Sequence, residues 1–242
     1  MTPILPVILI VLVVLATLFI AYSFYEGPFS KKFCDIYTRS WEPHADLVRK
    51  LNRYDLCGAH EDDVFDRYIY WNGEIVAAVS GDVLVFKGTD SLADIEEDLS
   101  PTIVHHKGGM VYTGISDMYD ALKPQLDMID CKKVTGWSLG AVLSILYSYD
   151  HPDAVESVIV FGQPPLFSKD FVDGYNSIMG SRTTSYLHRF DLIARPLLAL
   201  DGMVSSSQLN AYRAGETTYI NTGNLSRVFN HGLGYYHMSY LE

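Results

Sequence analysis

Short apolar runs bounded by glycine, asparagine or aspartate recur from residue 67 onward. Residues 67–90, RYIYWNGEIVAAVSGDVLVFKGTD, predict successive strands with turns at Asn72-Gly73 and Gly81-Asp82. The last of them, DVLVFKG, contains an uninterrupted apolar run that is typical of a buried strand. Three later segments also predict strands: CKKVTG, ESVIVFGQPP and SYLHRF, at 131–136, 156–165 and 185–190.

Helical spacing separates these strand candidates. ADLVRKLNRY at 45–54 is amphipathic, and SDMYDALKPQL at 116–126 is a helix that Pro124 should bend or end. LGAVLSILYSYD at 139–150 is apolar nearly all round, so we expect a buried helix that stops before His151-Pro152. Strands that alternate with helices predict an α/β fold, here a mixed sheet flanked by helices.

The first residues follow a different pattern. Residues 3–22, PILPVILIVLVVLATLFIAY, carry no charged side chain and are about long enough to cross a bilayer as a helix. A cleaved signal peptide or a buried core helix are the alternatives. The signal peptide is disfavoured because no basic residue precedes the run and no small-x-small site follows it. We therefore expect an uncleaved anchor at 1–25 and one folded domain at 26–242.

The flanks of this segment give a weak indication of orientation. Lys31, Lys32 and Arg39 follow it, and positive charge favours the cytoplasmic side, so the domain is expected to face the cytoplasm. The sequon Asn224-Leu225-Ser226 would matter only if the domain faced a lumen.

Composition narrows the class of protein. The 242 residues, 48% of them hydrophobic, suffice for one sizeable core, and a net charge of −11 argues against nucleic acid as a partner. Three cysteines, Cys34, Cys57 and Cys131, make a disulfide framework improbable and fit a reducing compartment. Oligomeric state is not indicated.

A candidate nucleophile lies between the strand CKKVTG and the buried helix. Gly136-Trp137-Ser138-Leu139-Gly140 fits the pattern G-x-S-x-G, in which a serine occupies a strained strand-to-helix turn. The helix would direct its N-terminal partial positive charge toward a developing anion. The simpler interpretation is a structural serine in a tight turn.

Such a serine needs a base and an acid that orients the base. In enzymes of this type they follow the serine in the order acid, then histidine. Asp191 comes after the SYLHRF strand, at the end where α/β sites gather. His231 and His237 lie late in the chain, and spacing alone does not choose between them.

Ordered motifs make the sequence resemble the class 3 lipase family, the fungal triacylglycerol lipase-like group. The segments that carry the resemblance are FKGT (86–89), VYTGISDMYDAL (111–122), VTGWSLGAVLS (134–144), VFGQPPLF (160–167), HRFDLIARPL (188–197) and HMSYL (237–241). The resemblance implies an α/β-hydrolase fold with no metal or organic cofactor.

The resemblance also implies roles for individual residues. Ser138 would be the nucleophile, Asp191 the acid and His237 the base, because His237 has the family's H-x-x-Y spacing. Thr89 would take the oxyanion position, with the backbone N–H of Leu139 as the second donor.

A lid helix follows the oxyanion strand in the family. Residues 92–99, LADIEEDL, would supply it here, although an ordinary surface helix has the same amphipathic pattern. The chain departs from the family's pattern at Lys87, Tyr112, Trp137 and Ala141, and these departures bear on the substrate range. Trp137 in particular could either pack under the sheet or narrow an acyl groove.

The predicted function is that of a membrane-anchored serine hydrolase that cleaves acyl esters of lipids, of the triacylglycerol or diacylglycerol type. Alternatives on the same triad are a phospholipase A1 and a short-chain carboxylesterase. A non-catalytic membrane protein that retains the fold is a third possibility.

Overall fold

A computed structural model describes residues 44–52 (except 45 and 49), 64–88, 103–188 and 212–220. They all belong to one compact unit, Arg39–Glu242. The predicted anchor and lid lie outside the described residues. Among the helices that are described, none has both the length and the hydropathy to span a bilayer.

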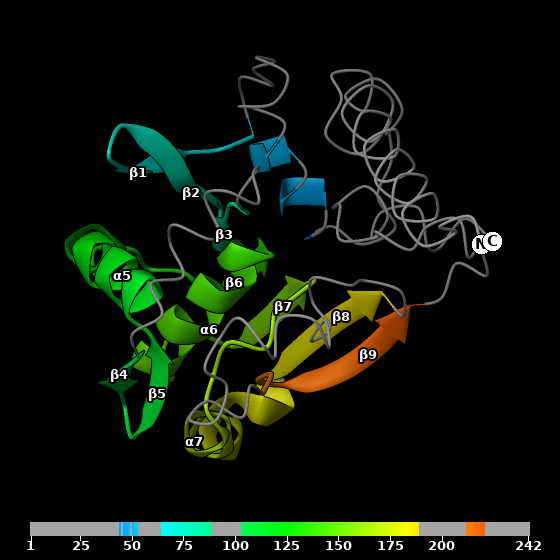
Figure 1. Ribbon diagram of the computed structural model, residues 1–242. Coiled ribbons are helices and arrows are strands. Elements are labelled where there is room, and N and C mark those ends of the chain that lie inside the picture. The colour runs from blue at the N-terminus through cyan, green and yellow to red at the C-terminus, as the bar shows by residue number, and fades with distance from the viewer. Residues whose placement is uncertain are drawn as a thin grey trace, which may run out of the picture. The chain divides into compact units, whose positions relative to one another are not determined.

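The described part of the chain forms a mixed sheet with flanking helices, as the strand and helix patterns predict (Figure 1). Its strand order is β1-β2-β3-β6-β7-β8-β9. The strands are β1 (Arg67–Trp71), β2 (Glu74–Ser80), β3 (Val83–Phe86), β6 (Lys133–Trp137), β7 (Ser157–Phe161), β8 (Thr183–His188) and β9 (Glu216–Ile220). β1, β2 and β3 pair antiparallel, and from β3 to β9 each pair is parallel.

The two predicted tight turns explain the antiparallel part. Asn72 and Gly73 have φ of 50° and 87°, and Gly81 has φ of 58°. Asparagine and glycine tolerate these left-handed angles, which two-residue hairpins require. The parallel pairs need crossover connections, and helices α5 (Thr113–Leu126), α6 (Leu139–Asp150) and α7 (Lys169–Met179) lie in three of them.

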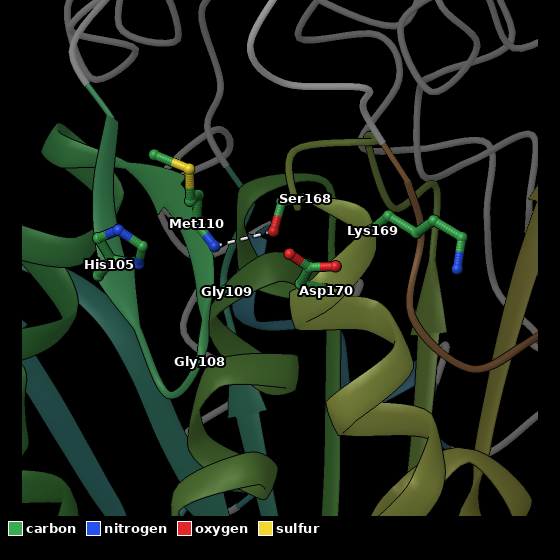
Figure 2. A pocket seen from close by; sticks show the side chains of 7 residues that line it. All are labelled: His105, Gly108, Gly109, Met110, Ser168, Lys169 and Asp170. Atoms are coloured by element: carbon green, nitrogen blue, oxygen red, sulfur yellow. Dashed lines mark hydrogen bonds between the residues drawn. The ribbon is translucent and has the colours of Figure 1, made fainter.

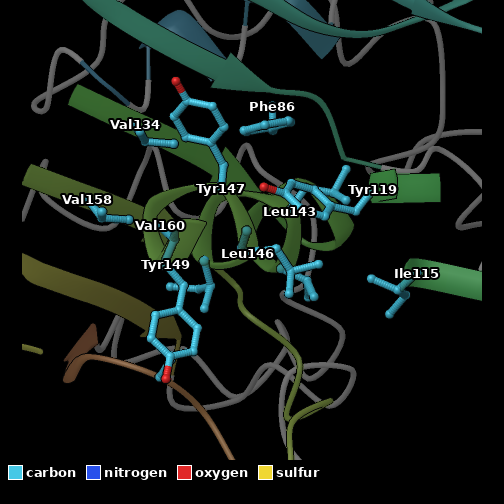
Figure 3. Packing of buried hydrophobic residues seen from close by; sticks show 14 of the residues in the cluster. Phe86, Ile115, Tyr119, Val134, Leu143, Leu146, Tyr147, Tyr149, Val158 and Val160 are labelled. Atoms are coloured by element: carbon cyan, nitrogen blue, oxygen red, sulfur yellow. The ribbon is translucent and has the colours of Figure 1, made fainter. Parts of the chain in front are cut away.

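Alternation along the central strands divides the core into two layers. Leu84 and Phe86 on β3 point into a large cluster with α5, α6 and α7, part of which is drawn in Figure 3. Val83 and Val85 point into a second cluster on the other face, to which helical residues 46–48 and 50–52 also contribute. The sheet is therefore covered on both faces, which is why its central strands are apolar on both sides.

Helix α6 has the predicted bounds and is buried over its whole length except at Asp150. Its serines satisfy their hydroxyls inside the core: Ser144 Oγ donates to the carbonyl of Gly140 at 2.7 Å. Ser148 Oγ lies 3.0 Å from Tyr175 Oη, which lies 2.7 Å from Thr183 Oγ1. This chain of hydroxyls joins α6, α7 and β8 without leaving those groups unpaired.

A small hairpin, β4 (Ile103–His106) and β5 (Gly109–Tyr112), precedes α5 and was not anticipated from the sequence. The predicted helix at 116–126 begins earlier, at Thr113, and continues through Pro124 to Leu126. Pro124 therefore does not end the helix; because it lacks an N–H, it removes one backbone hydrogen bond near the C-terminal end.

The C-terminal end of α6 carries a compact ionic cluster. The Asp150 carboxylate is 8% exposed, and it accepts hydrogen bonds from Lys123 Nζ and, at 3.0 Å, from Tyr119 Oη. Lys107 Nζ lies 3.0 Å from its other oxygen. Burial alone would raise the pKa of Asp150, but these donors outweigh burial and lower it to about 2. The carboxylate thus links α6 to α5 and to the β4–β5 hairpin.

Candidate active site

Ser138 occupies the turn between β6 and α6, and its backbone is strained. Its φ of 55° and ψ of −120° place a non-glycine residue in a sparsely populated region. Its N–H donates to the carbonyl of Phe161 at 3.0 Å, and its own carbonyl accepts from the N–H of Ala141 at 3.0 Å. This is the geometry that the G-x-S-x-G pattern predicts, and a relaxed turn serine would not need it.

The flanking glycines are required by contact distances. A Cβ atom on Gly136 would lie 2.2 Å from the carbonyl oxygen of Gly140. A Cβ atom on Gly140 would lie 2.4 Å and 2.5 Å from the carbonyl oxygens of Phe86 and Lys87. Real Cβ contacts are never this short, so both positions accept only glycine while β3, β6 and α6 keep their spacing.

The start of α6 supplies hydrogen-bond donors beside Ser138. Leu139 is the first residue of the helix, where a backbone N–H has no partner within the helix. The helix dipole adds partial positive charge at the same end. The predicted oxyanion donor Leu139 therefore has a position suited to stabilise negative charge next to the serine.

The register of the parallel strands brings other chain segments to the same edge of the sheet. Trp137, Phe161 and Tyr186 are level across β6, β7 and β8. Ser138 follows the first of them directly, and β8 leaves the sheet at His188. Carboxyl ends of parallel strands are where sites of α/β proteins lie.

Three predicted site residues, Thr89, Asp191 and His237, lie outside the described residues, as does the alternative base His231. The described chain ends directly before Thr89, at Gly88, and Asp191 is the third residue after β8. The roles of all five predicted site residues stay predictions; the structure describes Ser138 in the turn between β6 and α6, and Leu139 as the first residue of α6.

The sequence left open whether Trp137 packs under the sheet or narrows an acyl groove. Its side chain is 6% exposed and packs in the second cluster, with Val85 and Phe161 among its members. Its ring covers Gly88, where a Cβ atom would come within 2.2 Å of Trp137 Cε3. The indole therefore packs into the core on the face of the sheet opposite α6.

Two polar residues near this edge were missed by sequence reasoning. Asn52, 3% exposed, accepts a hydrogen bond from the N–H of Gly88 at 3.1 Å. Gln163, fully buried after β7, accepts one from Ser185 Oγ at 3.3 Å. For Asn52 a signal existed: it follows Val48 by one helical turn and so shares the apolar face of its helix.

A cavity of about 280 Å³ lies elsewhere in the described chain, between the β4–β5 turn and the start of α7 (Figure 2). Its lining is His105, Gly108, Gly109, Met110, Ser168, Lys169 and Asp170. Ser168 Oγ accepts hydrogen bonds from the N–H groups of Met110 and Phe171, so it caps α7 and ties it to β5. Of the predicted site residues that the structure describes, neither Ser138 nor Leu139 lines this cavity.

Comparison with known proteins agrees with this geometry. The family described as Lipase (class 3) matches residues 83–199. No curated protein matches the chain.

Solved lipase structures share the fold at low sequence identity. A triacylglycerol lipase from Penicillium expansum is 16% identical over 74% of this chain and 79% of its own, with a TM-score of 0.51. The Rhizomucor miehei lipase in complex with its propeptide is 18% identical over 75% and 70%, with a TM-score of 0.53. A protein named M37 lipase is 15% identical over 89% and 93%, with a TM-score of 0.55. Through residues 83–199 the chain belongs to the class 3 lipase family, on an α/β-hydrolase fold.

Proposed function

We propose that this protein is a serine hydrolase that cleaves acyl esters of lipids, with Ser138 as the nucleophile. The observation that carries the proposal is the strained backbone of Ser138 between β6 and α6. Strain of this kind persists only where the surrounding structure enforces it, and it gathers at functional sites. Membership of the lipase family makes an ester the expected substrate.

The proposed reaction has two halves. Ser138 Oγ attacks the ester carbonyl while His237 accepts the hydroxyl proton, and Asp191 holds the imidazole and stabilises its charge. The N–H of Leu139 and the Thr89 donors stabilise the oxyanion of the tetrahedral intermediate. The C–O bond to the alcohol then breaks, and His237 gives the alcohol its proton. Water attacks the acyl-enzyme with the same base, which releases the fatty acid and restores Ser138.

Lipid esters are favoured over small soluble esters because of the apolar segment at 3–22. We propose that it anchors the protein in a membrane as a single span, with the hydrolase domain on the cytoplasmic side. A tethered enzyme meets bilayer-resident esters at a high effective concentration. The triacylglycerol lipase from Penicillium expansum, which shares the fold, suggests an acylglycerol.

Activity-based labelling and lipid-class profiling test the proposal together. We expect an alkyl phosphonate probe to label the wild-type chain but not Ser138→Ala, and the wild type to hydrolyse acylglycerols in detergent or vesicles. Folded wild type that neither labels nor hydrolyses would refute catalysis. Activity confined to short p-nitrophenyl esters, or to the sn-1 ester of phospholipids, would replace the proposed substrate class.

The choice of base is tested by two histidine variants. His237→Ala should abolish turnover, because the serine then has no proton acceptor, while His231→Ala should retain most of it. The opposite result would assign the base to His231.

A further inference from the structure

We propose that Asn52 is a positioning residue for the oxyanion loop, by which we mean Gly88 and Thr89 directly after β3. Its side chain fixes the peptide group between Lys87 and Gly88 and, through it, the donor residue Thr89. This inference rests on the proposed function, because it assigns Thr89 to the oxyanion site. Asn52 would touch neither substrate nor reacting atoms.

The contact itself joins two distant parts of the chain. The Gly88 N–H donates to Asn52 Oδ1 at 3.1 Å, and the Asn52 amide group donates back to the carbonyl of Val48 at 2.7 Å. The second bond holds the amide so that its oxygen faces Gly88. Asn52 is 3% exposed, so water does not compete readily for either bond.

The place of Gly88 makes the contact relevant to the site. Phe86 on β3 is level with Gly136 on β6. Gly88 and Ser138 each come two residues later on these parallel strands. The fixed point thus lies one residue before Thr89 and beside the turn that carries the nucleophile.

Gly88 cannot be replaced by a stiffer residue here, because a Cβ atom would lie 2.2 Å from Trp137 Cε3 and 2.8 Å from the Trp137 carbonyl oxygen. Glycine, however, leaves two backbone dihedrals unusually free. The N–H of Thr89 belongs to the peptide group that follows Gly88. Rotation about the Gly88 dihedrals would therefore turn this donor away from the oxyanion. The Asn52 hydrogen bond fixes the Lys87–Gly88 peptide group, and close contact with Trp137 restricts Gly88 itself; together they limit this freedom.

The test compares full-length variants in the same detergent. Asn52→Leu keeps the number and branching of the side-chain heavy atoms and removes the acceptor, whereas Asn52→Asp keeps an oxygen for the Gly88 N–H. We expect Asn52→Leu to lower kcat about 10- to 100-fold with KM changed less than about threefold, since misplaced donors cost transition-state stabilisation. Asn52→Asp keeps the acceptor but loses the donor to the Val48 carbonyl, so it should recover only part of that loss. Hydrogen exchange of the peptide containing Gly88 should accelerate in Asn52→Leu only.

Two controls separate positioning from general destabilisation. Asn176→Leu removes an exposed bond in which the Gly215 N–H donates to Asn176 Oδ1, and Thr135→Val removes the bond that the buried Thr135 hydroxyl donates to the Ile159 carbonyl. Both should leave kcat within about twofold, because neither contact involves the oxyanion loop.

The outcomes are distinct. Unchanged kcat in Asn52→Leu, or an equal loss in Thr135→Val at matched stability, would overturn the inference. Unchanged exchange at Gly88 in Asn52→Leu would overturn the contact itself. An inactive but folded wild type would overturn the proposed function and the catalytic meaning of Asn52, and the exchange measurement would still report on the contact.

Discussion

At the scale of single residues, the turn that carries Ser138 depends on two flanking positions that have no Cβ atom. Ser138 accepts a left-handed φ because Gly136 and Gly140 allow β3, β6 and α6 to approach one another closely. The sequence pattern indicated small residues at both positions. It could not indicate that the carbonyls of Phe86 and Lys87 exclude a side chain at Gly140, since those contacts exist only once the chain is folded.

Gly140→Ala should therefore damage the site even though alanine favours helices. The new methyl group would overlap two backbone carbonyls, and backbone cannot yield as a flexible side chain can. We expect a loss of about 2 kcal/mol or more in the free energy of unfolding and at least a tenfold loss of turnover. Urea unfolding and ester hydrolysis measure the two effects.

The matched control for Gly140→Ala is Gly180→Ala, whose Cβ would lie 3.1 Å from Asn176 Cβ, a contact that a shift of a few tenths of an ångström relieves. Its effect should stay below about 1 kcal/mol. Equal effects of the two variants would contradict the steric argument.

Trp137 gives a second prediction at this scale. Trp137 departs from the class 3 lipase pattern, and its indole fills a buried cluster with Val85 and Phe161. Trp137→His should leave a void and place a polar ring among apolar side chains, lowering the free energy of unfolding by about 2–4 kcal/mol. Tyr70→His, at an aromatic that is 47% exposed, should cost less than about 0.5 kcal/mol. Thermal unfolding of both variants tests this, and a neutral Trp137→His would contradict the packing role.

At the scale of elements, the strongly patterned segments were predicted well. The bounds of α6 and the places of β3, β6, β7 and β8 agree with the apolar runs, because buried elements carry the clearest pattern. The β4–β5 hairpin and β9 were not foreseen. Glu216–Ile220 reads ETTYI, an edge strand with little apolar signal, and its membership of the sheet is decided by pairing with β8.

Asp150 yields a prediction about how elements are joined. Its pKa is lowered to about 2 from an ordinary value of 3.8. A carboxylate with a depressed folded pKa stabilises the fold above its unfolded pKa, and the contribution disappears as pH falls from about 4 toward 2. Asp150→Asn should thus cost roughly 2 kcal/mol at pH 7 and progressively less below pH 4.

Urea unfolding of wild type and Asp150→Asn at a series of pH values measures this difference. Asp173→Asn is the control, because the Lys169–Asp173 pair on α7 is exposed. Exposed pairs contribute little. A gap between wild type and Asp150→Asn that stays constant with pH would rule out the carboxylate as its source.

At the scale of the whole molecule, the sequence predicted the fold class and the family better than it could predict which distant residues meet at the site. Ordered motifs identify a fold, because each has its own place along the chain. The contact between Asn52 and Gly88 joins residues 36 positions apart and has no local pattern. Long-range hydrogen bonds of this kind become visible only when the sheet register is known.

The apolar segment at 3–22 gives the last prediction, which concerns the protein in the cell. If it spans the bilayer, the full chain should stay in the membrane pellet after alkaline carbonate extraction, since about twenty buried apolar residues bind essentially irreversibly. A chain that lacks residues 1–25 should be released.

Protease added to sealed membranes should remove a C-terminal tag if Lys31, Lys32 and Arg39 hold their side of the span in the cytoplasm. Release of the full chain by carbonate would contradict the anchor, and a protected tag together with glycosylation at Asn224 would reverse the orientation.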